Sequence, residues 1–226
     1  GMVGSGRSEL MTLLMGGAKK EGGEVLVDGQ KADFKQPSDA IRRKFCYITE
    51  DRQHTGLFLK HSIARNSMVA NLVNIRDFFI SPKQDYEVGE RYIQELGTKA
   101  KNADVTVGNL SGGNQQKVIV AREFSRPIKL LIASQPTRGL DVGSVEYIHK
   151  RILAARDAGA AILLVSSELD EIVALSDRIA VMYKGRLTGL VDPDEVTRQQ
   201  LGLLMAGYAN DERASSADAP QPKEAP

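Results

Sequence analysis

The sequence predicts an α/β protein built on a parallel β-sheet. Three short apolar runs, at residues 45–49, 129–133 and 161–165, have the length and composition of buried strands. Segments with a helical pattern lie between these runs and follow the last one. Strands that alternate with helices are typical of a parallel sheet covered on both faces. We therefore expect the polar residues at the carboxyl ends of these strands to share one edge of the sheet, where ligands bind in such folds.

The composition is that of a globular protein with a buried core. The chain has 226 residues, of which 42% are hydrophobic and 26% are charged. Its formal net charge of +1 gives no indication of a nucleic-acid partner. A single cysteine, Cys46, excludes an internal disulfide and fits a reducing compartment. No apolar run approaches the ~18 residues that span a bilayer, so we expect a cytoplasmic protein whose contact with a membrane requires a partner.

A glycine-rich segment at the start of the chain fits a phosphate-binding loop. Gly1 and Gly6 stand five residues apart, and Arg7 and Ser8 follow where such a loop has Lys and then Ser or Thr. A helical run at residues 9–15 comes next, as the motif requires. The strand that should precede the loop is missing, so we expect it upstream of residue 1 or from another segment. A flexible glycine-rich terminus would have a similar sequence.

A hairpin, a short helix and the first buried strand follow. Residues 24–30 alternate and turn at Asp28-Gly29, which predicts a hairpin, and residues 37–44 have the pattern of a short helix. The strand at 45–49 delivers Glu50-Asp51-Arg52 to the predicted ligand edge. A charged loop without a binding role is equally consistent with these three residues.

Residues 61–101 have helical patterns and no strand signal. One helix is expected from His61 to about Leu72, and a second begins at Ser81-Pro82. We interpret this block as a helical insertion in the α/β core.

The segment Leu110–Lys117 places a serine and two glycines before a helical pattern at residues 114–125. The first-turn N–H groups of a helix have no partner inside it, and the helix dipole favours an anion there. Gly112 and Gly113 allow a phosphate to approach the backbone, and the Ser111 hydroxyl adds a donor. These residues therefore predict an anion-binding helix start, although a capped helix after a turn has the same local sequence.

The second and third buried strands also end in polar residues. The strand at 129–133 leads to Ser134 and Gln135, and then to Gly139-Leu140-Asp141 before a long helix. The strand at 161–165 leads to Ser166-Ser167. Both sets are expected at the same edge of the sheet as Glu50.

The last part of the chain predicts a helix, a hairpin and a final helix. The first helix covers 169–175, and the hairpin pairs 178–183 with 186–191. Asp192-Pro193-Asp194 is expected to cap the final helix, which runs to about Ala206. From residue 209 onward the chain has no large apolar residue, which predicts a disordered tail.

In this order, the motifs resemble those of the ATP-binding cassette of an ABC transporter. The residues from Gly1 to Ser8 are similar to the Walker A loop, Leu110–Asn114 to the signature motif, and Gly139–Asp141 to the D-loop. Glu50 stands at the position of the Q-loop glutamine. The resemblance covers nearly the whole chain.

The resemblance implies a RecA-like P-loop NTPase fold. Its parts are a parallel sheet core, an inserted helical subdomain, and a small antiparallel β part, with the N-terminal strand or strands missing. We expect one nucleotide-binding cassette at residues 1–208, with the helical subdomain at about 61–125 and the disordered tail at 209–226.

Several runs look most like the second, degenerate cassette of tandem-cassette importers for simple sugars and purine nucleosides. These runs are Ser-Gly-Gly-Asn-Gln-Gln-Lys at 111–117, Gln-Pro-Thr-Arg-Gly-Leu-Asp-Val-Gly at 135–143 and Ser-Ser-Glu-Leu-Asp-Glu-Ile at 166–172. Three further runs, at 121–125, 131–136 and 147–151, lean toward the nucleoside branch.

The resemblance implies ATP and Mg²⁺ as ligands, with Mg²⁺ held only weakly at the chain's own site. Ser8 would be a weak magnesium ligand. The residues that the resemblance assigns to ATP binding are Gly1, Gly4, Gly6, Arg7, Ser8 and Glu50.

Four departures from the family pattern fall on the chain's own nucleotide site. Arg7 replaces the loop lysine, and Ser134 stands where the Walker B aspartate would help to hold magnesium. Gln135 replaces the catalytic glutamate, and Ser167 replaces the switch histidine. A glutamine cannot accept the proton of the attacking water, and a positioned base contributes ~10²–10⁴-fold. We expect this cassette to hydrolyse ATP poorly by itself, and no residue is assigned as catalytic.

The signature motif, in contrast, is intact. In this family two cassettes pair head to tail, which implies that Ser111, Gly112 and Gly113 complete a partner's ATP site in trans, with Asp141 in the D-loop. The implied partners are a second cassette (fused upstream or separate), membrane permease subunits, and indirectly a substrate-binding protein. The implied location is the cytoplasmic face of the cell membrane, held there peripherally by the permease.

Two other classes of function remain open at this point. A soluble, non-transport ABC-type regulator would share the motifs, although the neutral charge and the importer-like Asn114-Gln115-Gln116 argue against it. An autonomous ATPase is disfavoured by Ser134 and Gln135.

Overall fold

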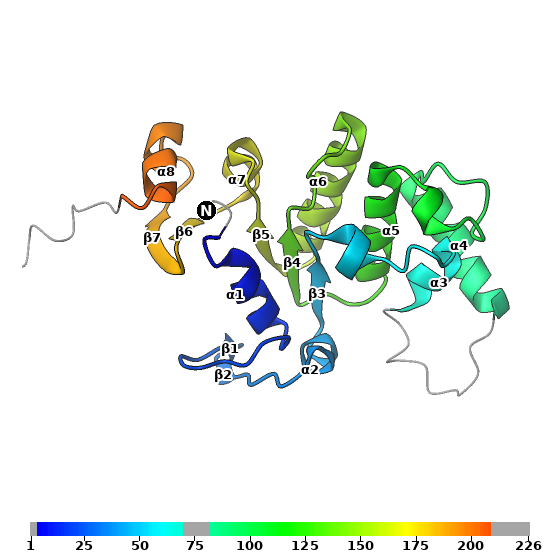
Figure 1. The fold of residues 1–226 in the computed structure, drawn as a ribbon, viewed down its shortest axis with the longest axis horizontal. Helices are drawn as coiled ribbons and strands as arrows, with labels where there is room; N and C mark the ends of the chain where they lie inside the picture. The colour runs from blue at the N-terminus through cyan, green and yellow to red at the C-terminus, as the bar shows by residue number, and fades with distance from the viewer. Residues whose placement is uncertain (1–3, 70–81, 209–226) are drawn as a thin grey trace, which may run out of the picture. The chain divides into compact units, whose positions relative to one another are not determined.

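The computed structural model describes residues 4–69 and 82–208 (Figure 1). These residues form two compact units: one is Met11–Ser166, and the other joins the segment up to Leu10 with the chain from Ser167 onward. Helix α1 (Arg7–Leu14) connects them. The predicted helix boundaries at Leu72 and Ser81, and the predicted tail, lie outside the described residues.

A parallel three-stranded sheet forms the core of the larger unit. The strands β3 (Phe45–Ile48), β4 (Leu130–Ser134) and β5 (Ala161–Val165) pair in the order β3-β4-β5. Ile48 lies opposite Ala133, so the carboxyl ends of β3 and β4 are level. The predicted parallel α/β core is confirmed.

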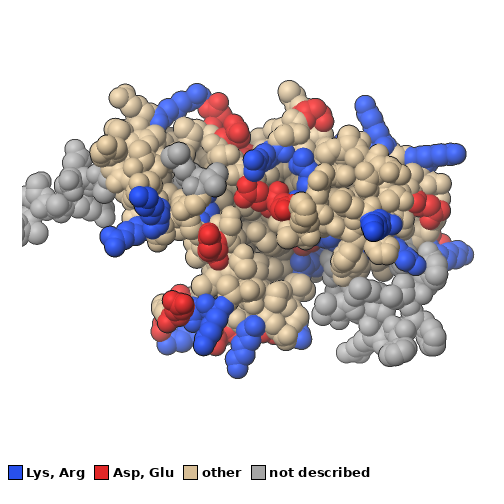
Figure 2. Space-filling view, viewed as in Figure 1, with Lys and Arg blue, Asp and Glu red and all other residues tan. Residues whose placement is uncertain are grey.

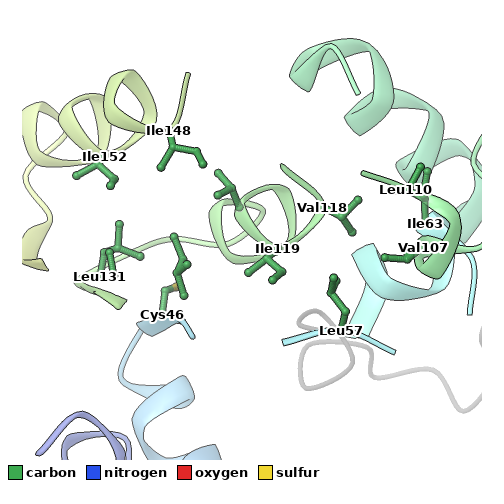
Figure 3. Packing of buried hydrophobic residues seen from close by; sticks show 13 residues of the cluster. Cys46, Leu57, Ile63, Val107, Leu110, Val118, Ile119, Leu131, Ile148 and Ile152 are labelled. Carbon is green, nitrogen blue, oxygen red and sulfur yellow. The ribbon is translucent and has the colours of Figure 1, made fainter. Parts of the chain in front are cut away.

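Both faces of this sheet are covered, because successive strand residues point to opposite sides. One face packs against α5 (Gly112–Phe124) and α6 (Val142–Asp157), and Figure 3 shows Ile119 of α5 close to the strand residues. The buried residues on this face are Cys46, Ile48, Ile119, Leu131, Ala133, Ile148 and Ile152. The buried cluster on the other face contains Met11, Met15, Ala40, Phe45 and Ile132. Burial also raises the pKa of the Cys46 thiol to about 12, so this cysteine packs as a small apolar side chain.

The third strand is less buried than its sequence predicts. Ala161 is exposed and the other four residues of β5 are half-buried. In residues 4–69 and 82–208, β5 pairs only with β4 and is therefore an edge strand, as is β3 at the other side of β4. An apolar composition on both faces does not distinguish an edge strand from an inner one.

The helical block contains α3 (Ile63–Met68), α4 (Pro82–Leu96), the 3₁₀ turn η3 (Val107–Asn109) and α5. Helices α3 and α4 pack closely because Gly89 has no side chain. A Cβ there would lie 2.7 Å from the Ala103 Cβ and 2.9 Å from the Ala64 Cα. Helix α5 begins at Gly112 and not at Asn114, so the two glycines belong to its first turn.

Short elements complete the larger unit. The predicted hairpin is present as β1 (Leu26–Val27) and β2 (Gln30–Lys31), and Asp28 and Gly29 both have positive φ, as a tight hairpin turn requires. Helix α2 (Pro37–Arg42) precedes β3, and a π-helical turn, η1 (Arg52–Gly56), follows it.

The smaller unit contains α7 (Leu169–Leu175), the antiparallel pair β6 (Ile179–Tyr183) and β7 (Arg186–Val191), and α8 (Arg198–Met205). Its core is Ile179, Val181, Leu201 and Leu204.

The predicted cap of the final helix is wrong. Thr197 caps α8 by accepting a hydrogen bond from the Gln200 N–H, and the Gln200 side chain accepts from the Thr197 N–H in return. This reciprocal pair is a capping box. Asp192 instead accepts from the Asp194 N–H and forms a turn. The Thr-x-x-Gln pattern was the stronger signal.

No helix in the described part of the chain is long and apolar enough to cross a membrane. On the face that Figure 2 shows, basic and acidic side chains are interspersed, in agreement with the net charge of +1.

Candidate functional site

Within the signature segment, Ser111 is exposed at the N-terminus of α5, whereas Gly113, Gln115 and Gln116 are buried. Ser111 is the N-cap residue, with φ −63° and ψ 157°, and Gly112 and Gly113 form the first turn of a 13-residue helix. The N–H groups of this turn have no partner within the helix, and the dipole adds partial positive charge. The predicted helix start is present, and anion binding at its first turn stays a prediction.

The two glycines are required by their neighbours. A Cβ on Gly113 would lie 2.7 Å from the Ser144 Oγ and 3.0 Å from the Asp141 Oδ2. A Cβ on Gly112 would lie 3.1 Å from the Arg52 Nη2. The turn formed by Ser111, Gly112 and Gly113, called the signature turn below, is therefore packed between the start of α6 and the turn that follows β3.

Asp141, the predicted D-loop residue, is the N-cap of α6. Its Oδ1 accepts a hydrogen bond from the Ser144 N–H at 3.0 Å, and its Oδ2 accepts from the Ser144 hydroxyl at 2.8 Å. These two bonds hold the pKa of Asp141 below its usual range. The structure thus brings Asp141 directly beside Gly113, although 28 residues of sequence separate them.

Glu50 is connected to the signature turn through Arg52, which the sequence placed beside it at the predicted ligand edge, and through Arg138, which the sequence did not single out. Arg138 donates to the Glu50 Oε1 at 2.8 Å, and Arg52 donates to the Arg138 carbonyl oxygen at 3.1 Å. The Arg52 guanidinium in turn lies against Gly112. The bond from Arg52 to Arg138 joins residues 86 positions apart and depends on the pairing of β3 with β4. The sequence would predict it only if the register of these two strands were known.

Ser134 and Gln135 lie at the carboxyl end of β4, and both are buried, with 2% and 6% of their surface exposed. The Gln135 N–H donates to the Val165 carbonyl at 2.7 Å. Gln135 has φ +48°, a left-handed conformation that costs roughly 1–2 kcal/mol for a residue other than glycine. The backbone therefore holds this side chain at a special strand-end position, but the group that it presents is an amide.

The phosphate-loop candidates lie in the smaller unit. Gly4 and Gly6 have φ angles of +76° and +92°, which residues with a side chain rarely adopt. Helix α1 begins directly after them, at Arg7. The Gly185 N–H donates to the Ser5 carbonyl at 2.9 Å. A Cβ on Gly6 would lie 3.1 Å from the Gly185 Cα. This loop leads into a helix as predicted; Gly1 lies outside the described residues.

The remaining candidates, Ser8 and Ser167, are both exposed. Ser8 is exposed in the first turn of α1, and Ser167 is exposed at the start of the second segment of the smaller unit. Within residues 4–69 and 82–208, no group of three or more His, Cys, Asp or Glu side chains is placed to hold a metal ion.

Comparison with known proteins identifies the class. Residues 1–138 match the family model for ABC transporters, so the chain belongs to the ABC transporter family. A dimeric ATP-binding cassette in a post-hydrolysis state, bound to ADP and Pi, has the same fold, with a TM-score of 0.70 and 19% identity. That match covers 84% of this chain and 81% of the other. A cassette of an ABC transporter complex from Clostridium perfringens aligns with a TM-score of 0.66 and 22% identity, over 89% and 78% of the two chains.

Curated relatives give more detail. The guanosine import ATP-binding protein of Bacillus subtilis is 40% identical over 221 residues, which cover 94% of this chain and 42% of the relative. The nucleoside import ATP-binding protein of Lactococcus lactis is 38% identical over 216 residues, and a ribose import ATP-binding protein of Lacticaseibacillus paracasei is 36% identical over 208. Each of these two matches covers 92% of this chain and 42% of the relative. The chain thus spans about two fifths of the length of these relatives.

Proposed function

We propose that this chain is an ATP-binding cassette of an ABC importer for nucleosides or simple sugars. The relatives named as nucleoside, guanosine and ribose import ATP-binding proteins support this substrate class. ATP is the ligand, and a membrane permease with a substrate-binding protein completes the importer. The cassette acts at the cytoplasmic face of the membrane, where the permease holds it.

The signature turn acts on a nucleotide that another cassette binds. The observation that carries this proposal is the exposure of Ser111 at an anion-binding helix start whose glycines are fixed by their neighbours. The Ser111 hydroxyl and the first-turn N–H groups donate to phosphate oxygens of the partner's ATP. Phosphoryl transfer depends mainly on such positioning and charge neutralisation.

The chain's own Walker site contributes little to hydrolysis. The positions at the end of β4 carry a hydroxyl and an amide, and neither supplies the carboxylate oxygens that Mg²⁺ prefers. Gln135 also cannot take a proton from water. Its side chain is buried at the end of β4, and its backbone has φ +48°, but the group that it carries is an amide and not a base. The residues present therefore do not fit a competent magnesium-dependent site.

Substitutions in the two phosphate loops test this division of labour in the assembled importer. Arg7→Ala is expected to change steady-state ATP turnover by less than about threefold, because hydrolysis does not depend on this chain's own loop. Alanine at the phosphate-loop lysine of the companion cassette is the matched variant and is expected to reduce turnover to background. Equal losses from the two substitutions would contradict the proposed asymmetry.

A further inference from the structure

The hydroxyl of Ser111 does not perform the usual task of a serine at a helix N-cap. Such a serine accepts a hydrogen bond from the N–H of the second or third helical residue. Among the described residues, the Ser111 side chain makes no capping bond to the backbone. The Asn114 side chain, three residues later, donates from its Nδ2 to the Ser111 Oγ at 2.9 Å.

The direction of this hydrogen bond is fixed by the other end of the Asn114 amide. The Lys99 backbone N–H lies 3.1 Å from the Asn114 Oδ1. A backbone N–H can only donate, so the amide atom that faces it is the oxygen. The atom facing Ser111 is then the NH₂ group, which can only donate, and the Ser111 oxygen accepts.

The loop that supplies the Lys99 N–H is itself tied to α5. The Lys117 ammonium donates to the Gly97 carbonyl at 3.3 Å and lies 5.4 Å from the centroid of the Tyr147 ring. The Thr98 N–H donates to the Ile93 carbonyl at 3.1 Å, which closes the end of α4. Contacts with α5 therefore hold the Lys99 N–H at a fixed position relative to the signature turn.

We propose that Asn114 is a positioning residue that directs the Ser111 O–H outward as a donor to a phosphate oxygen. A hydroxyl has one hydrogen and two acceptor lone pairs. Because Asn114 donates to this oxygen, the Ser111 hydrogen does not point at Asn114 and is left to donate to an acceptor outside the helix. This inference rests on the proposed role of the signature turn and names the residue that orients it.

Asn114→Asp tests the direction of the bond with almost no change in shape. Aspartate still accepts from the Lys99 N–H, but it also accepts the Ser111 hydrogen and so turns the hydroxyl inward. We expect kcat for ATP in the assembled importer to fall by about 100-fold, with a smaller change in KM, because a hydrogen bond to a charged group is worth up to about this factor. Asn114→Ala leaves the hydroxyl free to rotate and is expected to lose less than about tenfold.

A double-mutant cycle with Ser111→Ala tests whether Asn114→Asp lowers turnover through the Ser111 hydroxyl. It distinguishes that effect from the effect of the added charge and from structural damage. If Asn114 acts through the hydroxyl, Asn114→Asp costs at least tenfold less in the Ser111→Ala background than in the natural one. If the two substitutions instead lower turnover independently, so that their factors multiply in the double variant, the inference is overturned. Asn102→Asp is the charge control, since Asn102 also accepts a backbone N–H, that of Asp104 at 3.2 Å, and is expected to leave turnover unchanged.

The same cycle distinguishes two failures. If Ser111→Ala alone leaves turnover of the importer unchanged, the signature turn does not act on a nucleotide and the proposed function fails. If Ser111→Ala lowers turnover but Asn114→Asp has no effect, only the role of Asn114 is overturned.

Discussion

Ser111→Arg is expected to reduce ATP turnover of the assembled importer at least 100-fold. The substitution places a long cationic side chain where an exposed hydroxyl marks the start of α5. A cation is unfavourable at the positive end of a helix dipole, and its bulk covers the N–H groups that a phosphate would contact. In enzymes, the loss of an oriented hydrogen-bond donor of this kind lowers kcat by roughly 10²–10³-fold. Steady-state phosphate release measures the effect.

The matched control places the same side chain where it has room. Gly22→Arg adds an arginine at an exposed position where a Cβ meets nothing within 4 Å. We expect this variant to retain the turnover of the natural protein. Turnover of Ser111→Arg equal to that of the control would show that the signature turn of this chain serves no nucleotide.

Glu123→Ala is expected to lower the free energy of unfolding by about 3–5 kcal/mol. Glu123 of α5 lies between two arginines: its Oε1 is 3.0 Å from the Arg122 Nε, and its Oε2 is 2.7 Å from the Nη2 of Arg126, just beyond the end of the helix. All three side chains are at most 10% exposed. Removing the carboxylate leaves two buried cations without their counter-ion, the case in which breaking a buried ion pair is most costly. Arg122 also donates to the Gly56 carbonyl at 2.8 Å, so the damage reaches η1.

Chemical denaturation followed by circular dichroism measures this loss. Glu95→Ala is the control: it removes an exposed glutamate on α4, 3.9 Å from Arg91, and such surface pairs contribute less than about 1 kcal/mol. A change for Glu123→Ala no larger than for Glu95→Ala would mean that the buried cluster does not hold α5 in place.

Local patterns in the sequence predicted most of the fold. The apolar runs predicted β3 and β4, and the Asp28-Gly29 pair predicted the first hairpin, because both residues have the positive φ that a tight turn needs. The sequence did not predict properties that depend on neighbouring elements or on competing local signals. The edge position of β5 depends on which strands pair with it, and the start of α8 depended on the choice between two competing cap sequences.

The motif residues of the site were also visible in the sequence, but their connections were not. Ser111, Gly113 and Asp141 could be named from their motifs, yet the close approach of Gly113 to Asp141 is a property of how α5 and α6 pack. Arg52 was expected at the ligand edge with Glu50, and Arg138 was interpreted only as part of a motif, but the sequence did not show that these arginines join Glu50 to the signature turn. Asn114 was read only as part of a family pattern, since its role depends on a backbone N–H fifteen residues away.

The number of ATP molecules hydrolysed per pair of cassettes in a single turnover tests the central claim most directly. The assembled importer, saturated with ATP and sampled by rapid quenching, is expected to form one ADP per cassette pair in the first turnover. Only the site that combines the companion's Walker residues with Ser111, Gly112 and Gly113 of this chain would then be active. Formation of two ADP per pair would show that this chain's own Walker residues also support hydrolysis, and would contradict the account.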